Sequence, residues 1–378
     1  MCGDGLGEAG SDEDGMSDQQ NKARGSKGLK LQEAPPEGKR LTINDVARLA
    51  NVSKKTISRV INHSPLLKQE TRERVLAVIR EVGYVPDPQA RGLAFRRSFL
   101  IGLVYDNPNA QYVIDMQQGI LDAVRGSGFE LVVYPCHRKH PNFVADVKAF
   151  VQRQKLFGVV LPPSVSEDED LARMLDEIGC SYTRIAAVAL DVPSRMVVTH
   201  DHKGAAEAAR HLADLGHERI GYISGPQSFR STHERGKGFR QGLADRGIQL
   251  DPRFVVEGGY TFESGIVCAK HLLSLNPRPT AIFTGNDEMA VGVYRAAHEA
   301  GLDIPADLSV VGFDDSPVVS KVWPPLTSVR LPIHDMGAIA ARKLLADQQG
   351  PEGGREIEEY SVSPALVVRQ STSIPKKK

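Results

Sequence analysis

After Phe99 the sequence alternates short apolar runs with helical stretches, and this alternation leaves few possible folds. The runs are FLIGLVY, FELVVY, FGVVL, IAAVAL, RIGYIS, FVVE, TAIFT and SVVGF. Apolar strands that alternate with helices are typical of parallel sheets with helices on both faces. Roughly 270 residues with about ten strands are too many for one ordinary sheet. We therefore expect an α/β fold with two doubly wound parallel-sheet subdomains.

Residues 1–38 have a composition that cannot support a packed core. They are rich in Gly, Ser, Asp, Glu and Gln and contain few large apolar residues. Burial therefore cannot offset the entropy lost on ordering, and we expect a disordered tail over 1–38. Met16 lies inside this tail, and translation from that codon is an alternative that the sequence leaves open.

Charge is unevenly distributed along a chain whose formal net charge is zero. Residues 39–97 contain 13 Lys and Arg against five Asp and Glu, whereas residues 1–38 contain four against eight. A basic module inside a neutral chain indicates a polyanionic partner.

Residues 42–82 have the pattern of three short helices, separated by NVS and HSPLLKQ. In the second helix Ser53 can cap the first turn, and Ile57, Val60 and Ile61 share one buried face. The opposite face carries hydrogen-bond donors: Lys54, Lys55, Ser58, Arg59 and Asn62. The flanking helices are expected to bury Val46 and Ala50 on one side and Val75, Ile79 and Val82 on the other. This pattern predicts a helix-turn-helix for the major groove of DNA, and the plainer alternative is a solvated basic face.

The segment DPQARGLAFRR, residues 87–97, is expected to form a short helix that folds only on its target, because Gly92 weakens it. Leu93 would then be an apolar side chain between Arg91 and Arg96, suited to insertion into the minor groove. The alternative is a linker leucine that packs against the larger domain.

These segments resemble a known family. TINDVARLANVSKKTISRVIN, TRERVLAVIREVGYVP and ARGL closely resemble the headpiece and hinge of the lactose-repressor (LacI/GalR) family of bacterial transcription regulators. The resemblance continues through GHERIGYISGP, GNDEMAVGVYRAAHEAGLDIPADLSVVGFDD, PPLTSVR and LVVRQST and covers roughly residues 41–373. It implies four parts after the tail: a headpiece over 39–86, a hinge helix over 87–98, an effector-binding and dimerisation core over 99–373 that is similar to periplasmic binding proteins, and a basic tail over 374–378.

The resemblance also implies roles for single residues in DNA binding. Lys54, Lys55 and Arg59 match positions that read base edges, Tyr84 matches a headpiece contact, and Leu93 matches the hinge wedge. Asp87 departs from the asparagine common in the family, so no phosphate contact is assigned to it.

Ligands of open parallel sheets bind beyond the carboxyl ends of the strands, so polar residues after each run are candidates. They are Asp106, Asp191, Arg235, Tyr260, Asn286 and Asp314. Carboxylates, an amide and a guanidinium suit a polyhydroxylated ligand, and an aromatic ring can stack on a sugar. Helix capping is an equally good explanation of Asn286 from the residues alone. The resemblance implies that all of these except Asp106, whose match is less clear, hold the effector.

Other function classes find little support. The four cysteines have no paired spacing, the 11 histidines have no metal-ligand spacing, and no glycine-rich phosphate loop follows the first strand. No nucleophile with a neighbouring base is apparent, and the sequence has neither a secretory signal nor an apolar run that could span a membrane. We expect no catalytic site, no metal, no cofactor and no membrane association.

Together these observations predict a cytoplasmic, nucleoid-associated repressor whose operator affinity responds to a small sugar-like effector. Two hinge leucines must meet at one minor-groove step in the family picture, so a homodimer on a pseudo-palindromic operator is expected. One alternative is a solute-binding protein of a transport system, which would share the core fold. A second alternative is a sugar-processing enzyme.

Overall fold

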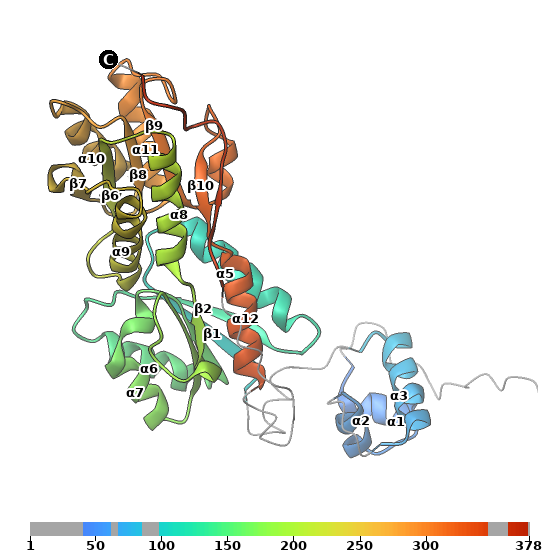
Figure 1. Ribbon diagram of the computed structural model, residues 1–378. Helices are drawn as coiled ribbons and strands as arrows, with labels where there is room; N and C mark the ends of the chain where they lie inside the picture. The colour runs from blue at the N-terminus through green and yellow to red at the C-terminus, as the bar shows by residue number, and fades with distance from the viewer. Residues whose placement is uncertain (1–40, 62–66, 85–97, 347–361, 377–378) are drawn as a thin grey trace, which may run out of the picture. The chain divides into compact units, whose positions relative to one another are not determined.

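The computed structural model describes residues 41–61, 67–84, 98–346 and 362–376. The chain divides into two compact units, Met1–Asp87 and Pro88–Lys378 (Figure 1). The predicted tail over 1–38, Asn62, Leu93 and most of the predicted hinge lie outside the described residues.

The first unit is a bundle of three helices: α1 (Ile43–Leu49), α2 (Lys54–Ile61) and α3 (Gln69–Glu81). Thr42 begins α1 with a capping box that it forms with Asp45, and the Ser53 hydroxyl accepts the backbone N–H of Thr56 at 3.1 Å to begin α2. The core contains Val46, Ala50, Ile57, Val60, Val75 and Val78. The helical expectation is confirmed, but α3 buries Val78 where Ile79 and Val82 were predicted, and both of these are only partly buried.

The first sheet of the larger unit has five parallel strands in the order β2-β1-β3-β4-β5. They are β1 (Leu100–Tyr105), β2 (Glu130–Pro135), β3 (Gly158–Leu161), β4 (Ser181–Ala186) and β5 (Met196–Val198). Strand residues such as Leu103 and Val160 share a core with α5 (Ala110–Val124) and α12 (Ile333–Ala346). Their neighbours Val104 and Val159 face α6 (Phe143–Gln154) and α7 (Glu169–Glu177) instead. Helices therefore cover both faces, as the apolar runs predict.

The second sheet has six strands in the order β11-β10-β9-β8-β6-β7. They are β6 (Ile220–Ser224), β7 (Val255–Glu257), β8 (Ala281–Thr284), β9 (Ser309–Asp314), β10 (Thr327–Arg330) and the antiparallel edge strand β11 (Ala365–Val367). One face packs against α8 (Asp201–Asp214) and α9 (Arg230–Ala244), the other against α10 (Phe262–Ser274) and α11 (Asp287–Glu299). Short 3-10 turns lie at Val165–Glu167, Pro193–Arg195, Pro252–Phe254 and Pro317–Ser320.

The chain crosses between the two sheets more than once. It passes from β5 into α8 of the second sheet, returns from β10 into α12 of the first, and re-enters the second sheet as β11 (Figure 1). Backbone bonds join these passages to their surroundings: Val362 N donates to Val198 O at 3.3 Å, and Leu331 N donates to Asp314 O at 3.3 Å. One apolar core runs through both subdomains on the side of α5, α12, α8 and α9.

One predicted strand was displaced. The run IAAVAL suggested a strand over 185–190, but β4 spans Ser181–Ala186 and the chain leaves the sheet there. Apolarity was misleading because β4 carries Arg184, which is 1% exposed and satisfied by partners inside the fold. The following strand, β5, has only three residues and was not predicted.

No helix in the described part of the chain is both long and apolar enough to cross a membrane.

Candidate functional site

The exposed side of α2 is the candidate DNA-binding surface. Ile57 and Val60 are buried against α1 and α3, so their positions fix which side chains point outward. Lys54 and Lys55 are exposed, and Ser58 and Arg59 are half-buried beside them. The helix-turn-helix thus exposes a basic side of α2, and the first turn of this helix contains no acidic residue.

Tyr84 follows α3 through a tight helix end. Gly83 adopts a φ of 61°, and the Tyr84 backbone N–H donates to Ile79 O at 3.1 Å, which closes the last turn of α3. Tyr84 packs against the core of the first unit and is half-buried. Its position relative to α2 is therefore fixed within the first unit.

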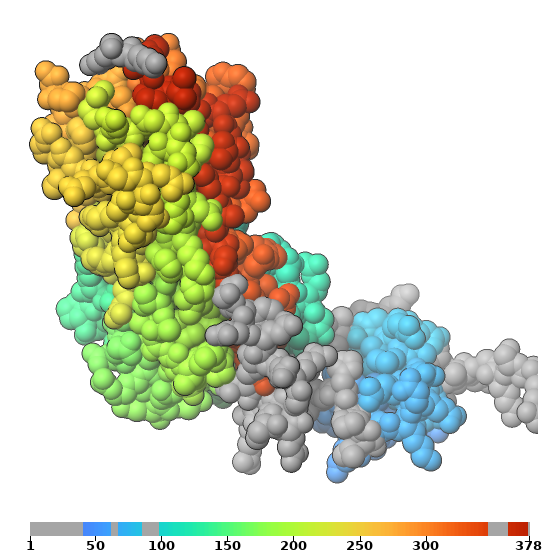
Figure 2. Space-filling view, in the orientation of Figure 1, coloured from blue at the N-terminus to red at the C-terminus, as the bar shows by residue number. Residues whose placement is uncertain are grey.

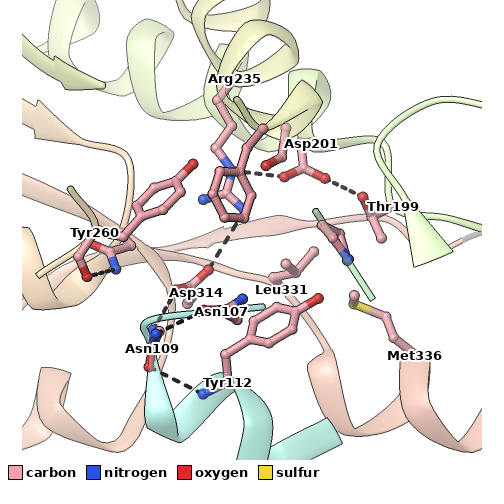
Figure 3. A pocket seen from close by; sticks show the side chains of 14 residues that line it. Asn107, Asn109, Tyr112, Thr199, Asp201, Arg235, Tyr260, Asp314, Leu331 and Met336 are labelled. Atoms are coloured by element: carbon pink, nitrogen blue, oxygen red, sulfur yellow. Dashed lines mark hydrogen bonds and ion pairs between the residues drawn. The ribbon is translucent and has the colours of Figure 1, made fainter. Parts of the chain in front are cut away.

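A pocket lies between the two sheets of the larger unit, and side chains from both subdomains line it (Figure 3). The lining residues are Asn107, Asn109, Tyr112, Pro163, Thr199, Asp201, Phe229, Ser231, Arg235, Tyr260, Asn286, Asp314, Leu331 and Met336. Four of the six predicted effector residues are among them. The free volume is about 40 Å³, enough for a few water molecules, so a sugar-sized ligand needs the walls to move apart.

Arg235 is the central cation of the pocket, and protein groups occupy most of its donors. Its Nε donates to Asp201 at 2.8 Å, an Nη donates to the carbonyl of Gly285, and the other Nη lies 3.8 Å from Asp314. The guanidinium also lies 3.8 Å from the ring centre of Phe313. Burial acts to lower the pKa of Arg235, but the nearby Asp201, Tyr260 and Asp314 together outweigh it and hold the pKa above its usual value. The cation is therefore neutralised inside the protein.

Asp314 ends β9 and reaches both walls of the pocket. Its Oδ2 accepts the side-chain N–H of Asn109 from the first subdomain at 3.4 Å. Burial raises the pKa of Asp314 well above its usual value, and although Arg235 at 3.8 Å opposes this effect, the Asp287 and Asp201 carboxylates add to it. Asp314 also has a φ of 109°, a conformation that is costly for a residue with a side chain.

Aromatic rings form one side of the pocket. Tyr260 packs edge to face against Phe229 with ring centres 5.4 Å apart, and its hydroxyl bonds the Thr232 hydroxyl at 2.9 Å. Asn286 donates to the backbone carbonyl of Tyr260 at 3.0 Å and accepts the N–H of Met289 at 3.0 Å. Asn286 thus caps α11, as the alternative explanation predicted, and also shapes the pocket wall.

The Tyr112 hydroxyl is a polar group of the pocket whose hydrogen-bonding capacity is unused. It is buried and has no hydrogen-bond partner among the described residues. Burial raises the pKa of Tyr112, with the Asp201 carboxylate adding to the effect, so the hydroxyl keeps its proton. A buried donor without a partner is costly, and a ligand oxygen would satisfy it.

Two predicted effector residues do not line this pocket. Asp106 accepts the backbone N–H of Arg138 at 2.9 Å. Asp191 accepts the Tyr182 hydroxyl at 2.9 Å and lies 3.9 Å from Arg184. The run IAAVAL and the family resemblance both predict an effector role for Asp191, which follows the end of β4 at Ala186 by several residues.

Sequence reasoning missed Asp201, Thr199, Asn109 and Tyr112. Asp201 follows the short strand β5 and would have been found by the strand-end rule if MVV had been recognised as a strand. Asn109 caps α5 after β1, and Tyr112 lies in the first turn of that helix. A helix N-terminus after a strand was a usable signal for both, but Asp106 was nearer to the strand and was chosen instead.

A second contact joins the subdomains beside the pocket. Both carboxylate oxygens of Glu167, in the loop after β3, accept the backbone N–H of Arg230, at 3.1 and 3.2 Å. Arg230 is the first residue of α9, and the preceding Phe229 supplies no side-chain cap. Arg138 also crosses the cleft and donates to Ser228 O at 3.3 Å. Glu167 therefore caps a helix of the opposite subdomain.

Comparison with known proteins bears on both units. A model of bacterial regulatory proteins of the lacI family matches residues 42–87, and a model of a periplasmic binding protein-like domain matches residues 209–372. The HTH-type transcriptional regulator DegA of Bacillus subtilis (strain 168) is 33% identical over 336 residues, which cover 88% of this chain and 98% of that protein. This chain belongs to the lacI family. It is a helix-turn-helix transcription regulator of that family.

Solved structures of lacI-family proteins have the same architecture. The lac repressor dimer bound to operator and the anti-inducer ONPF is 29% identical with a TM-score of 0.71, and the match covers 89% of this chain and all of that one. A complex of the transcriptional regulator CelR with cellobiose is 31% identical with a TM-score of 0.65 and covers 88% of this chain and all of that one. In the described residues of this lacI-family chain, no group of three or more metal-ligating side chains is present.

Proposed function

We propose that this lacI-family protein binds operator DNA as a homodimer and that an uncharged, sugar-like effector in the pocket controls its DNA affinity. The observation that carries the proposal is the joining of two units in one chain. A helix-turn-helix with a basic α2 can read DNA, and a pocket lined from two subdomains can sense a ligand that favours one arrangement of them.

The chemistry of the pocket favours a neutral ligand. Its cation, Arg235, is already neutralised by Asp201 and Asp314, so no free positive charge remains to pair with a phosphate or carboxylate. The polar groups that remain include the Asn107 amide and the Tyr112 hydroxyl. Such groups suit the hydroxyls of a sugar, while Phe229 and Tyr260 offer rings to its C–H face.

The solved relatives point the same way. Their ligands include cellobiose and ribose, and the lac repressor complex is a dimer on its operator. We carry these properties to this chain as a class: a neutral saccharide and a two-fold symmetric operator. Lys54, Lys55 and Arg59 of α2 are the proposed base-reading residues, and Tyr84 is proposed to contact DNA beside them.

The alternatives explain less of the chain. A solute-binding protein of a transport system would use the pocket but would have no use for a helix-turn-helix unit. A sugar-processing enzyme would need a nucleophile and base near the ligand, whereas Asp201 and Asp314 are held by Arg235. Both alternatives predict a protein that functions without DNA. A cytoplasmic regulator that binds chromosomal DNA accounts for both units.

The DNA half of the proposal is tested by Arg59→Ala, measured by fluorescence anisotropy on operator and on random DNA at one fixed salt concentration. Loss of a bidentate base contact should cost about 1 to 3 kcal/mol on operator and narrow the difference between the two DNAs. Arg80→Ala, an exposed arginine on α3, is the matched control. Equal weakening on both DNAs would instead make Arg59 a phosphate contact.

The effector half is tested by a thermal-shift screen that pairs neutral sugars with their phosphates. We expect stabilisation by a neutral sugar and less by its phosphate. Stabilisation only by phosphorylated sugars would contradict the proposed class of ligand. The same ligand should change operator affinity in the anisotropy assay, because it can act only through its preference for one arrangement of the subdomains.

A further inference from the structure

A second pocket lies on the other side of α9 from the effector pocket, between this helix and strands β6 and β7. It is lined by Tyr222, Ser224, Gln227, Thr232, His233, Gly236, Lys237, Arg240 and Val255, and its free volume is about 160 Å³. Figure 2 shows that the part of the chain around α9, coloured yellow, lies at the surface of the larger unit.

The wall that α9 contributes is cationic. Lys237 and Arg240 are exposed on the same side of the helix as His233, at a spacing of three to four residues. In the described part of the chain neither Lys237 nor Arg240 forms an ion pair with a carboxylate. The carboxylate at the end of β7, Glu257, is engaged by the backbone N–H of Gln227 at 3.3 Å.

The floor of the pocket is a buried hydroxyl that lacks a partner. Tyr222 is 1% exposed, and its Oη forms no hydrogen bond with any described residue. Burial raises the pKa of Tyr222, so the hydroxyl keeps a proton that it can donate. Leaving such a donor unpaired is costly, and an acceptor in the pocket would remove the cost.

Gly236 brings the hydroxyl and a cation to the same space. A Cβ atom at this position would lie 3.7 Å from Tyr222 Oη and 3.1 Å from Arg240 Nη1, so both groups border one point. The absence of a side chain at Gly236 leaves that point open to a ligand. A neutral hydrogen-bond donor and a guanidinium that converge in this way suit an oxygen that carries negative charge.

We propose that this pocket, the α9 anion site, binds a small anionic metabolite through Arg240, Lys237 and the Tyr222 hydroxyl. Phosphate and carboxylate groups share the required chemistry, and a phosphate has more oxygens to share among the three donors. The site is separate from the effector pocket, whose own cation is neutralised within the protein. The two pockets are neighbours across α9, since Thr232 lines this site and its hydroxyl bonds that of Tyr260 in the other.

The test is calorimetric titration of the full chain with inorganic phosphate and, separately, with acetate, against chloride at the same ionic strength. We expect phosphate to bind, Arg240→Gln to weaken it at least fivefold, and Tyr222→Phe to weaken it at least twofold. Tyr222→Phe should raise the thermal unfolding temperature slightly without phosphate, because it removes a buried hydroxyl that has no partner among the described residues. Lys321→Gln, which removes an exposed charge far along the chain, should bind phosphate normally.

Further outcomes decide where and what binds. Unchanged phosphate affinity in Asp314→Ala places the anion outside the effector pocket, whereas tighter binding in that variant, through Arg235 released from Asp314, would overturn the proposal. Tighter binding of acetate than of phosphate would assign the site to carboxylates. If phosphate released no more heat than chloride, or if the wild type and Arg240→Gln bound phosphate equally well, Lys237 and Arg240 would be only solvent-exposed charges. None of these results depends on which sugar occupies the effector pocket.

Discussion

The two sheets of the larger unit follow the same plan but use their strand ends differently. Without the antiparallel edge strand β11, the order of the second sheet is β7-β6-β8-β9-β10, which is the same arrangement of first to fifth strand as β2-β1-β3-β4-β5 in the first sheet. In the second sheet the strand-end residues Asn286 and Asp314 line the effector pocket. In the first sheet Asp106 binds the backbone of Arg138, which itself reaches across the cleft. A shared topology therefore predicts where polar residues cluster but not which of them face the ligand.

The largest difference between the two subdomains is expected in the loss of stability when the buried arginine of each is replaced. Arg235 pairs with Asp201 and Asp314, which are both nearly inaccessible, whereas the nearer carboxylate partner of Arg184 is Glu169, whose side chain is 58% exposed, with Asp191 at 3.9 Å. Arg235→Met should destabilise the protein by about 3 to 5 kcal/mol, because two buried carboxylates lose their cation. Arg184→Met should cost less, about 1 to 3 kcal/mol, since Glu169 can be solvated.

Urea unfolding followed by circular dichroism measures both losses. Arg253→Met, which removes a surface pair with Asp251, is the control for the substitution itself. Equal losses for Arg235→Met and Arg184→Met would break the comparison, because the two arginines would then be structurally equivalent.

The next effect concerns ligand affinity. Asp314→Ala should weaken binding of an effector sugar by about 1.5 to 3 kcal/mol, the usual cost of losing a hydrogen bond to a charged or buried acceptor. Asp106→Ala should change it by less than about 0.5 kcal/mol, because Asp106 does not line the pocket. Calorimetry with the sugar found in the thermal-shift screen measures both, and DNA affinity without sugar should stay unchanged in each variant. A large loss of sugar affinity in Asp106→Ala would mean that strand-end residues of both sheets bind the ligand.

A smaller effect is expected where the two sheets meet. Glu167→Gln keeps an acceptor for the Arg230 N–H but removes the charge at the start of α9, which should cost about 0.5 to 1 kcal/mol. Hydrogen exchange of the first amides of α9 should quicken accordingly, while the last turn of the helix stays protected. Asp170→Asn, on a neighbouring surface pair with Arg173, is the control. Unchanged exchange at Arg230 would show that the cap contributes nothing.

The smallest expected effect is a pH dependence of stability that arises where α5 and α12 pack together on the first sheet. His334 on α12 bonds Asp122 on α5 at 3.0 Å, and this bond raises the pKa of His334. The folded state then holds a proton that the unfolded chain releases near pH 6.5, so the stabilisation is complete below that pH. It is lost as the pH rises through the raised pKa. His334→Gln should flatten the stability curve slightly between pH 6 and 8 in thermal unfolding, and an unchanged slope would assign the pH dependence to other groups.

The sequence was sufficient to predict what depends on local pattern. The two doubly wound sheets, the three-helix headpiece and the buried face of α2 follow from apolar periodicity and are confirmed. Four of six predicted effector residues line one pocket, and two of them, Asn286 and Asp314, lie at the ends of the apolar strands β8 and β9. The strand-end rule did not find Asp201, because β5 has only three residues and was not predicted as a strand, and Asp191 lies several residues after the end of β4.

The remaining features were not predictable because they depend on tertiary approach. That the N–H of Arg230 finds its cap in Glu167 requires the loops after β3 and β6 to face one another. That the Tyr112 hydroxyl is left without a partner depends on every neighbour that surrounds it. No periodicity in the sequence encodes either of these facts.

The repeated crossing of the chain between the sheets has a consequence for synthesis. When the ribosome has made β1 to β5, the first sheet still lacks α12, whose Met336, Ala340 and Leu344 cover its apolar face. That helix is translated only after nearly all of the second sheet. Because domains usually fold as their last structural element emerges, the first subdomain must wait with part of its core exposed while the second is built. A nascent chain halted before residue 333 would therefore hold a nearly complete second sheet and an unfinished first one, so the two subdomains mature almost together at the end of translation.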